Sequence, residues 1–418
     1  MRKTAWTTMV AVGAALLLVV GAAQAGEALK VGFVYVSPIG DAGWTYQHDL
    51  GRKAMEQALG NKVTTKFVEN VPEGADAERI IRELASSGHK LILTTSFGYM
   101  NPTIKVAPQF PDVAFMHATG YKSAKNVGIY NARFYEGRYL AGIVAGKMTK
   151  KNVAGYVGAF PIPEVLQGIN AFMRGMKSVN PAAEIKVVWV NSWFDPGKER
   201  EAAVTLIAQG ADVVTHHTDS TATVQAAEEK GVWAVGYHSD MSKYGPKAHL
   251  TAATHLWGDT YTKAAQDVLA GKWKPMNVWG GIKDKMVKLA PINAAVPAEV
   301  KEQVAKVEKE IVAGKFHPFA GPVKDNEGKE RVAAGKTMSD AEMQKMDFYV
   351  EGVQGKLPKP YAGSHKKHKG WLGPDFMRNR SDTKGETARG DNDRPRTRPC
   401  CPEPSPTGSR ANGSWRDE

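Results

Sequence analysis

Cysteine is almost absent from this chain. The 418 residues include only two cysteines, Cys400 and Cys401, both near the C-terminus. The segment from Glu27 to Lys359 must therefore fold without a disulfide and depend on packing. Its about 330 residues are enough for two domains, each with its own core. The adjacent cysteines themselves do not have the spacing of a metal or redox motif.

Catalytic signatures are also missing. The sequence contains no HExxH, GxSxG or CxxC pattern. Six residues separate Gly328 from the Gly-Lys-Thr at 335–337, whereas a phosphate-binding loop needs four. His216 and His217 are adjacent at the end of a predicted strand, where neighbouring side chains point to opposite faces, so they cannot easily share a metal. We expect no enzymatic activity, no metal site and no cofactor.

Long apolar runs are confined to the N-terminus. A basic start at 1–3 precedes an uncharged apolar stretch at 7–20, and Ala23-Gln24-Ala25 fits the small-x-small cleavage rule. Residues 1–25 are therefore predicted to be a signal peptide, cleaved near Ala25, that exports the chain to the periplasm. A retained anchor is the alternative, although the run is short for a membrane span. No cysteine follows the run, so a lipid anchor is not expected.

Charge is spread rather than concentrated. The net charge is +12, but lysines alternate with acids, as at 301–302 and 306–310. This pattern indicates a solvated surface, and no nucleic acid partner is expected. Residues 360–418 differ, because they are rich in Arg, Asp, Gly, Pro and Ser without apolar periodicity. We expect a disordered tail there, with read-through or a shifted frame as a further hypothesis.

Short apolar segments alternate with helical patterns along the body. Predicted strands lie at 29–36, 63–68, 91–95, 113–117, 153–157, 185–190, 213–215, 232–235, 250–254 and 286–289. Such alternation predicts parallel sheets, and the rhythm occurs twice. The fold class is therefore α/β, with two Rossmann-like lobes, a hinge and a ligand cleft between the lobes. We assign 27–130 and 256–290 to the first lobe, and 131–255 and 291–359 to the second.

The most informative segment is 31–52. A strand ends in the loop 37–43, and a helical pattern starts at once with Trp44. This tryptophan stands at the carboxyl end of a strand, where open α/β sheets bind ligands. An indole at that place leaves apolar surface exposed unless a flat group covers it. Ordinary packing within the loop is the alternative interpretation.

Aromatic and polar residues follow five other predicted strands, at 96–99, 117–119, 191–195, 218–220 and 236–240. We expect them to line the two lips of one cleft. Trp193, from the second lobe, would oppose Trp44 across a planar ring, and each stacked face contributes about 1–3 kcal/mol. The candidates for contacts with the ring edge are Phe97, Thr119, Asp219, His238 and Asp240. For Asp219 a helix N-cap is an equal alternative.

Five motifs in order carry a resemblance to a known family. They are Gly40-Asp41-Ala42-Gly43-Trp44, the helix at 136–142, the Val-Gly-Ala-Phe-Pro-Ile-Pro at 157–163, the Trp-Phe-Asp-Pro-Gly-Lys-Glu at 193–199 and the ending at 346–352. Over about 29–359 the chain resembles the basic membrane protein family, the purine nucleoside receptor type of substrate-binding protein in ABC importers. The resemblance implies a type I periplasmic-binding-protein fold and a purine held between Trp44 and Trp193.

Two positions depart from the family pattern. Nucleoside-binding members carry a ribose-binding aspartate and a lysine where this chain has His238 and His255. A carboxylate and an ammonium together bind a sugar diol well. Because this chain lacks both at these positions, we expect a free nucleobase, adenine, rather than a nucleoside. The alternative is that the neutral histidines still hydrogen-bond a ribose.

Two other functional classes are alternatives. An exported receptor for sugars or amino acids, or a sensor module, would share the fold. A nucleoside hydrolase would use Asp41, Asp219 or Asp240, but these are spread over separate loops of both lobes. The preferred interpretation is a monomeric receptor whose partners are a purine ligand and an ABC permease in the inner membrane.

Overall fold

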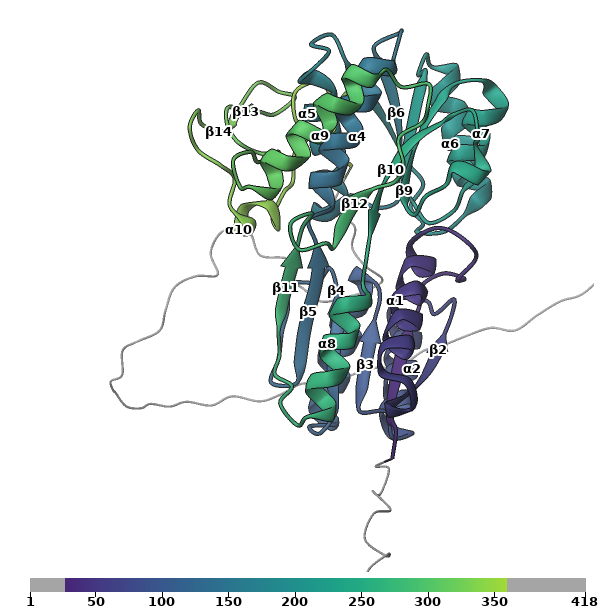
Figure 1. The fold of residues 1–418 in the computed structure, drawn as a ribbon, viewed down its shortest axis with the longest axis vertical. Helices are drawn as coiled ribbons and strands as arrows, with labels where there is room; N and C mark the ends of the chain where they lie inside the picture. The colour runs from purple at the N-terminus through teal and green to yellow at the C-terminus, as the bar shows by residue number, and fades with distance from the viewer. Residues whose placement is uncertain (1–26, 359–418) are drawn as a thin grey trace, which may run out of the picture. The chain divides into compact units, whose positions relative to one another are not determined.

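The computed structural model describes residues 27–358, and the predicted signal peptide (1–25) and tail (360–418) lie outside this part of the chain. The first of two six-stranded sheets has the order β11-β5-β4-β3-β1-β2 (Figure 1). Its strands are β1 (Leu29–Val34), β2 (Val63–Val68), β3 (Leu91–Thr94), β4 (Ala114–Ala118), β5 (Val127–Ala132) and β11 (Asn277–Gly280). All neighbours in this sheet are parallel, as the alternating pattern predicts.

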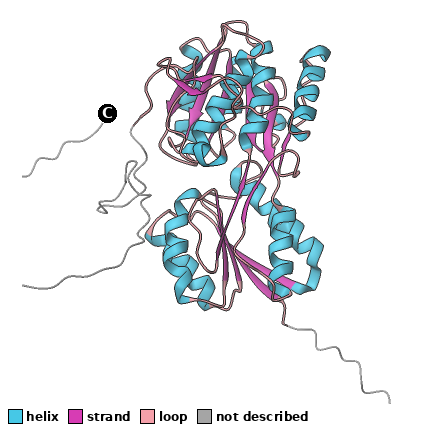
Figure 2. Ribbon diagram, turned by 90° about the vertical axis from the view of Figure 1, so that its left-hand side faces the viewer, coloured by secondary structure: helices cyan, strands magenta, loops and turns pink. Residues whose placement is uncertain are grey.

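Helices cover both faces of the first sheet (Figure 2). The helices are α1 (Trp44–Leu59), α2 (Ala75–Ser86), α3 (Met100–Val106) and α8 (Gly258–Leu269). Successive strand residues point to opposite faces, so Val31 and Phe33 pack in the cluster with α1 and α8. Val34 packs in a separate cluster with α2 and α3. The strands are therefore buried on both sides, which explains their unbroken apolar sequences.

The second sheet repeats this arrangement in the order β12-β10-β9-β8-β6-β7. Its strands are β6 (Val153–Gly158), β7 (Glu184–Trp189), β8 (Val213–His217), β9 (Trp233–His238), β10 (His249–His255) and β12 (Val287–Leu289). Its helices are α4 (Phe134–Met148), α5 (Pro163–Lys177), α6 (Pro196–Ala208), α7 (Ala222–Lys230) and α9 (Ala298–Val312). At the α4–α5 crossing a Cβ on Gly142 would lie 2.2 Å from the Phe172 carbonyl oxygen, so a side chain there would force the helices apart.

The chain passes between the two sheets three times, after β5, after β10 and after β11. The third passage corrects the expected lobe boundary at 290. Strand β12 does not return to the first sheet but pairs antiparallel with β10, with His255 opposite Val287. The first sheet also continues beyond the strand predicted at 113–117, because β5 pairs with β4 and lies between β4 and the edge strand β11.

A C-terminal segment contacts the connection between β5 and α4. It contains the two-stranded sheet β13 (Val323–Lys324) and β14 (Glu330–Val332) and the short helix α10 (Asp340–Met343). Arg133, which links β5 to α4, forms two hydrogen bonds of 2.7 Å with the Asp340 carboxylate. Its guanidinium also lies 4.8 Å from the ring centre of Trp279. Within residues 27–358, no helix has the length and apolar character needed to cross a bilayer.

Candidate functional site

A cavity with about 310 Å³ of empty space lies between the two sheets. The first lobe contributes Val36, Trp44, Ser96, Phe97 and Thr119 to its walls. The second lobe contributes Ile162, Glu164, Trp193, His217, Asp219 and His238. These residues stand at or just beyond the carboxyl ends of strands, the edge where open α/β sheets bind ligands.

Six of the eight predicted site residues line this cavity: Trp44, Phe97, Thr119, Trp193, Asp219 and His238. The structure corrects the expectation for the other two. Asp240 is exposed and accepts a hydrogen bond of 2.9 Å from the Ser242 backbone N–H, so it stabilises a turn. His255 is fully buried behind His238, and its Nε2 lies 3.0 Å from His238 Nδ1. Neither residue is on the cavity wall.

Trp44 is the first residue of α1 and is 7% exposed. Its indole N–H donates a 2.6 Å hydrogen bond to the Thr95 carbonyl, which fixes the ring against the end of β3. The ring also meets His238 edge-on, at 5.2 Å between centres, and Trp257 at 6.2 Å. Trp44 therefore packs against its neighbours, as the alternative interpretation holds, and it also lines the cavity.

Trp193 lies in the loop between β7 and α6 and is half-buried. Its ring packs edge-on against Phe160 at 5.0 Å. Its indole N–H donates a 3.0 Å hydrogen bond to Glu73 Oε1, in the first lobe. The same oxygen accepts hydrogen bonds from the Ser96 hydroxyl and the Gly98 backbone N–H. Glu73 therefore ties the second-lobe tryptophan to the rim of the first lobe.

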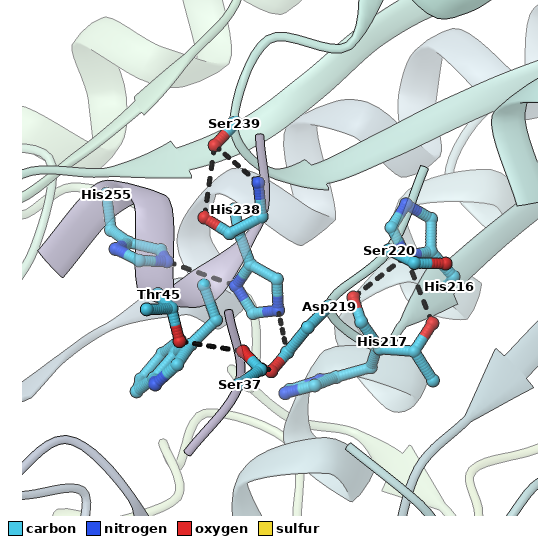
Figure 3. Close-up of polar contacts among 12 residues, drawn as sticks. Ser37, Thr45, His216, His217, Asp219, Ser220, His238, Ser239 and His255 are labelled. Atoms are coloured by element: carbon cyan, nitrogen blue, oxygen red, sulfur yellow. Dashed lines mark hydrogen bonds and ion pairs between the residues drawn. The ribbon is translucent and has the colours of Figure 1, made fainter. Parts of the chain in front are cut away.

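Asp219 is buried where the two lobes meet (Figure 3). Its Oδ2 accepts a 3.1 Å hydrogen bond from the Ser37 hydroxyl of the first lobe. Its Oδ1 is 3.6 Å from His238 Nε2. Burial, followed by the nearby Glu199 carboxylate, raises the pKa of Asp219 well above its usual value. The carboxyl group is therefore readily protonated and can both donate and accept hydrogen bonds.

The histidines around the cavity are held neutral. Burial lowers the pKa of His238 and of His217 well below the usual value, and that of His255 to about 3. Within the His238–His255 pair, one ring nitrogen donates to the other. His255 also packs against Trp44 and Phe134, at 5.1 and 5.3 Å between ring centres. The pair is thus part of an aromatic cluster and carries no charge toward the cavity.

Glu164 and His217 are cavity residues that the sequence did not reveal. From the sequence we predict a helix at 165–179 and a strand at 213–215, so Glu164 and His217 fall just outside these two elements. The available signal was Pro163, a residue favoured in the first turn of a helix. The structure starts α5 at Pro163 and extends β8 to His217. As a result, Glu164 Oε1 lies 3.4 Å from His217 Nε2 at the cavity wall.

Burial raises the pKa of Glu164 to about 8, and the Thr119 hydroxyl partly offsets this effect. The α5 N-terminus favours a negative charge, but such an effect reaches at most about 2 kcal/mol. Removing a carboxylate from water costs several kcal/mol. Desolvation therefore dominates, and Glu164 carries its proton at neutral pH. No lysine or arginine of residues 27–358 lines the cavity, so the described wall offers uncharged hydrogen-bonding groups between aromatic rings.

The three acids considered for hydrolysis lie in different surroundings. Residues 27–358 contain no cluster of three histidine, cysteine, aspartate or glutamate side chains placed to hold a metal ion. Of the acids considered for hydrolysis, Asp41 and Asp240 are exposed, and only Asp219 lines the cavity. Asp41 is instead paired with Lys243 at 2.5 Å on the surface.

Comparisons with known proteins agree with this architecture. The profile of the Bmp family, described as PnrA-like ABC transporter substrate-binding proteins, matches residues 28–316. A purine-binding protein of Brucella abortus is 56% identical over 339 residues, covering 81% of this chain and 97% of the relative. A protein of Haloferax volcanii, assigned provisionally as an ABC transporter glucose-binding protein, is 39% identical over 81% of this chain and 83% of its own length.

Solved structures match the fold as well. An ABC transporter solute-binding protein from Conexibacter woesei superimposes with a TM-score of 0.57 at 23% identity, over 69% of this chain and 98% of the other. At that identity the match supports the fold alone. The two-lobe architecture is consistent with a type I periplasmic-binding-protein fold. With the profile match and the relative at 56% identity, the chain belongs to the Bmp family of PnrA-like ABC transporter substrate-binding proteins.

Proposed function

We propose that this protein is an exported, monomeric receptor that holds a free purine base, adenine, between Trp44 and Trp193 and delivers it to a membrane permease. The observation that carries this proposal is a cavity lined by one tryptophan from each lobe and by no lysine or arginine of the described residues. Two indoles provide apolar faces for a flat ring. The purine-binding relative at 56% identity adds support for this ligand class.

A free base suits this cavity better than a nucleoside. The resemblance places ribose recognition at His238 and His255, and these two side chains are 1% and 0% exposed. They hydrogen-bond each other and pack against aromatic rings, so they offer a sugar neither charge nor open space. Adenine also matches the protonated acids of the wall, because it combines an amine donor with ring nitrogen acceptors. The Asp219 carboxyl is the proposed acceptor for the exocyclic amine.

Sugar binding is the second candidate, favoured by the name of the Haloferax volcanii relative. A sugar needs several polar groups that fix its hydroxyls in place. Here the walls include Val36, Phe97 and Ile162 besides the two tryptophans. The flat faces of the two tryptophans and Phe97 favour a heterocyclic ring, with the polar wall residues left to contact its edge.

A ligand screen tests the proposal. Adenine is expected to raise the melting temperature of the purified mature protein, because a ligand bound only to the folded state stabilises it by RT ln(1 + [L]/Kd). Glucose, the anionic purine urate and adenosine monophosphate are expected to produce no comparable shift, since the wall has no cation for the two anions. Stabilisation by glucose but by no purine would contradict the proposal.

Binding is proposed to close the two lobes, because the contacts that join them surround the cavity. The Ser239 hydroxyl of the second lobe bonds both the N–H and the carbonyl of Gly43, at 3.0 and 3.2 Å. Gly43 has a φ of 104°, and a Cβ there would lie 2.1 Å from the Asp219 carbonyl oxygen. A ligand that contacts both lobes favours this closed arrangement over an open one.

Replacing Gly43 with alanine is therefore expected to weaken adenine binding by about tenfold, measured by isothermal titration calorimetry, since the new methyl group prevents full closure. Gly88→Ala is the matched control. Gly88 has a similar φ of 89°, but a Cβ there would meet nothing within 4 Å, so it tests backbone strain without a clash between lobes. Equal affinities for the two variants would show that Gly43 is not needed for closure.

A further inference from the structure

Glu164 presents an unused polar atom at the cavity. Its Oε2 is inaccessible to solvent and forms no hydrogen bond with the described residues, Oε1 lies 3.4 Å from His217 Nε2, and the Thr119 hydroxyl is close enough to the carboxyl group to lower its pKa. The side chain is 11% exposed and belongs to the cavity wall. A buried polar atom without a partner is costly, and this one borders the space assigned to the ligand. A ligand atom can supply the missing partner.

We propose that Glu164 is a specificity-determining residue that donates a hydrogen bond from its Oε2 hydroxyl to an unprotonated ring nitrogen of the bound purine. This inference rests on the proposed function. In this arrangement neutral His217 donates from Nε2 to Glu164 Oε1, which leaves the acid proton on Oε2. A ring nitrogen of the purine then accepts the hydrogen bond that the Oε2 hydroxyl donates.

The surroundings of Glu164 support this assignment of protons. The ionisable groups that face it come from three strands and a loop: His217 on β8, Tyr156 on β6, Tyr237 on β9 and Asp219 after β8. Arg138 on α4 lies one layer further, against the rings of Tyr156 and Tyr237. Arg138 uses its Nη atoms on Thr215 and the His216 carbonyl, and its guanidinium lies 3.4 Å from the centre of the Tyr237 ring. It also disfavours a second positive charge on His217, whose pKa is lowered first by burial and then by this guanidinium.

The affinity for adenine is expected to fall as the pH rises through the pKa of Glu164. The donor form of Glu164 exists below its pKa of about 8, so binding is unaffected by this group at pH 7. Above pH 8 the Glu164 carboxyl group loses its proton, and the resulting carboxylate repels the lone pair of the ring nitrogen. Affinity for adenine is therefore expected to fall about tenfold between pH 7 and pH 9. Asp219 can add its own pH dependence, so Glu164 must be isolated by substitution.

The decisive experiment combines ligand analogues with variants. Calorimetry at pH 7 compares adenine with 1-, 3- and 7-deazaadenine, each of which replaces one ring nitrogen with C–H. In the wild type one analogue is expected to bind at least tenfold more weakly than adenine. In Glu164→Ala this ratio should drop to about threefold or less. In Glu164→Gln, whose amide keeps an N–H donor, the ratio should persist and the decline in affinity between pH 7 and pH 9 should become smaller.

The controls separate the competing outcomes. Glu299→Gln, at an exposed glutamate in the first turn of α9, should leave both the ratio and the pH profile unchanged. Circular dichroism establishes that each variant is folded, and Glu164→Gln still tests the pH profile if Glu164→Ala does not fold. Identical ratios in wild type and Glu164→Ala, or identical pH profiles in wild type and Glu164→Gln, would overturn the role of Glu164. Failure of the wild type to bind any purine would instead refute the proposed function.

Discussion

Trp193→Ala is expected to weaken adenine binding by about tenfold or more, with the fold retained. Loss of one stacked face costs about 1–3 kcal/mol, which corresponds to about 5- to 150-fold in affinity. The substitution also removes the hydrogen bond from the indole to Glu73, which joins the lobes at the rim. The ring is half-buried in a loop, so its removal leaves the sheet intact.

Two further variants define the cause of this loss. Trp193→Phe keeps an aromatic face but lacks the N–H donor, so it isolates the stacking contribution from the bond to Glu73. Trp233→Ala removes another half-buried tryptophan, at the start of β9, that is not on the cavity wall. Calorimetry should show near-normal affinity for this control. An unchanged affinity in folded Trp193→Ala would exclude a sandwich of two indoles.

The double variant His238→Asp with His255→Lys is expected to shift selectivity from adenine toward adenosine by about a hundredfold. The wild type should bind adenine at least tenfold more tightly, because the neutral histidine pair gives a ribose no charged partner. An aspartate at position 238 would offer the diol a carboxylate on the cavity wall, and a lysine at position 255, behind it, would supply the partner charge; the resemblance implies both groups in nucleoside receptors. The two substitutions are combined because a single buried charge without its partner is strongly destabilising.

Calorimetry with adenine and adenosine, for the wild type and the double variant, measures this change in selectivity. The two single variants serve as controls and are expected to unfold at lower temperature than the double variant, since each buries an uncompensated charge. Tighter binding of adenosine than of adenine by the wild type would refute the preference for a free base. Unchanged selectivity in a folded double variant would show that the histidine pair does not set it.

Much of the architecture follows from the sequence alone. The predicted strand at 63–68 coincides with β2, and the predicted strand at 250–254 lies within β10. Such segments carry their own periodicity, so local pattern is sufficient to define them. Strand β5 was not predicted, because Asn131 and Gly128 interrupt its apolar run and its edge partner β11 is short and remote in the sequence. Pairing within the sheet, rather than local sequence, makes this segment a strand.

The sequence determined that the chain has two α/β lobes and that aromatic and polar residues follow the strands where a ligand would bind. Only the tertiary structure decided which of those side chains reach the cavity. It placed Glu164 and His217 on the wall, His255 behind His238, and Asp240 in a surface turn. The physical reason is that the direction of a side chain at a strand end depends on segments packed from elsewhere in the chain. Its protonation depends in turn on the burial that this packing produces.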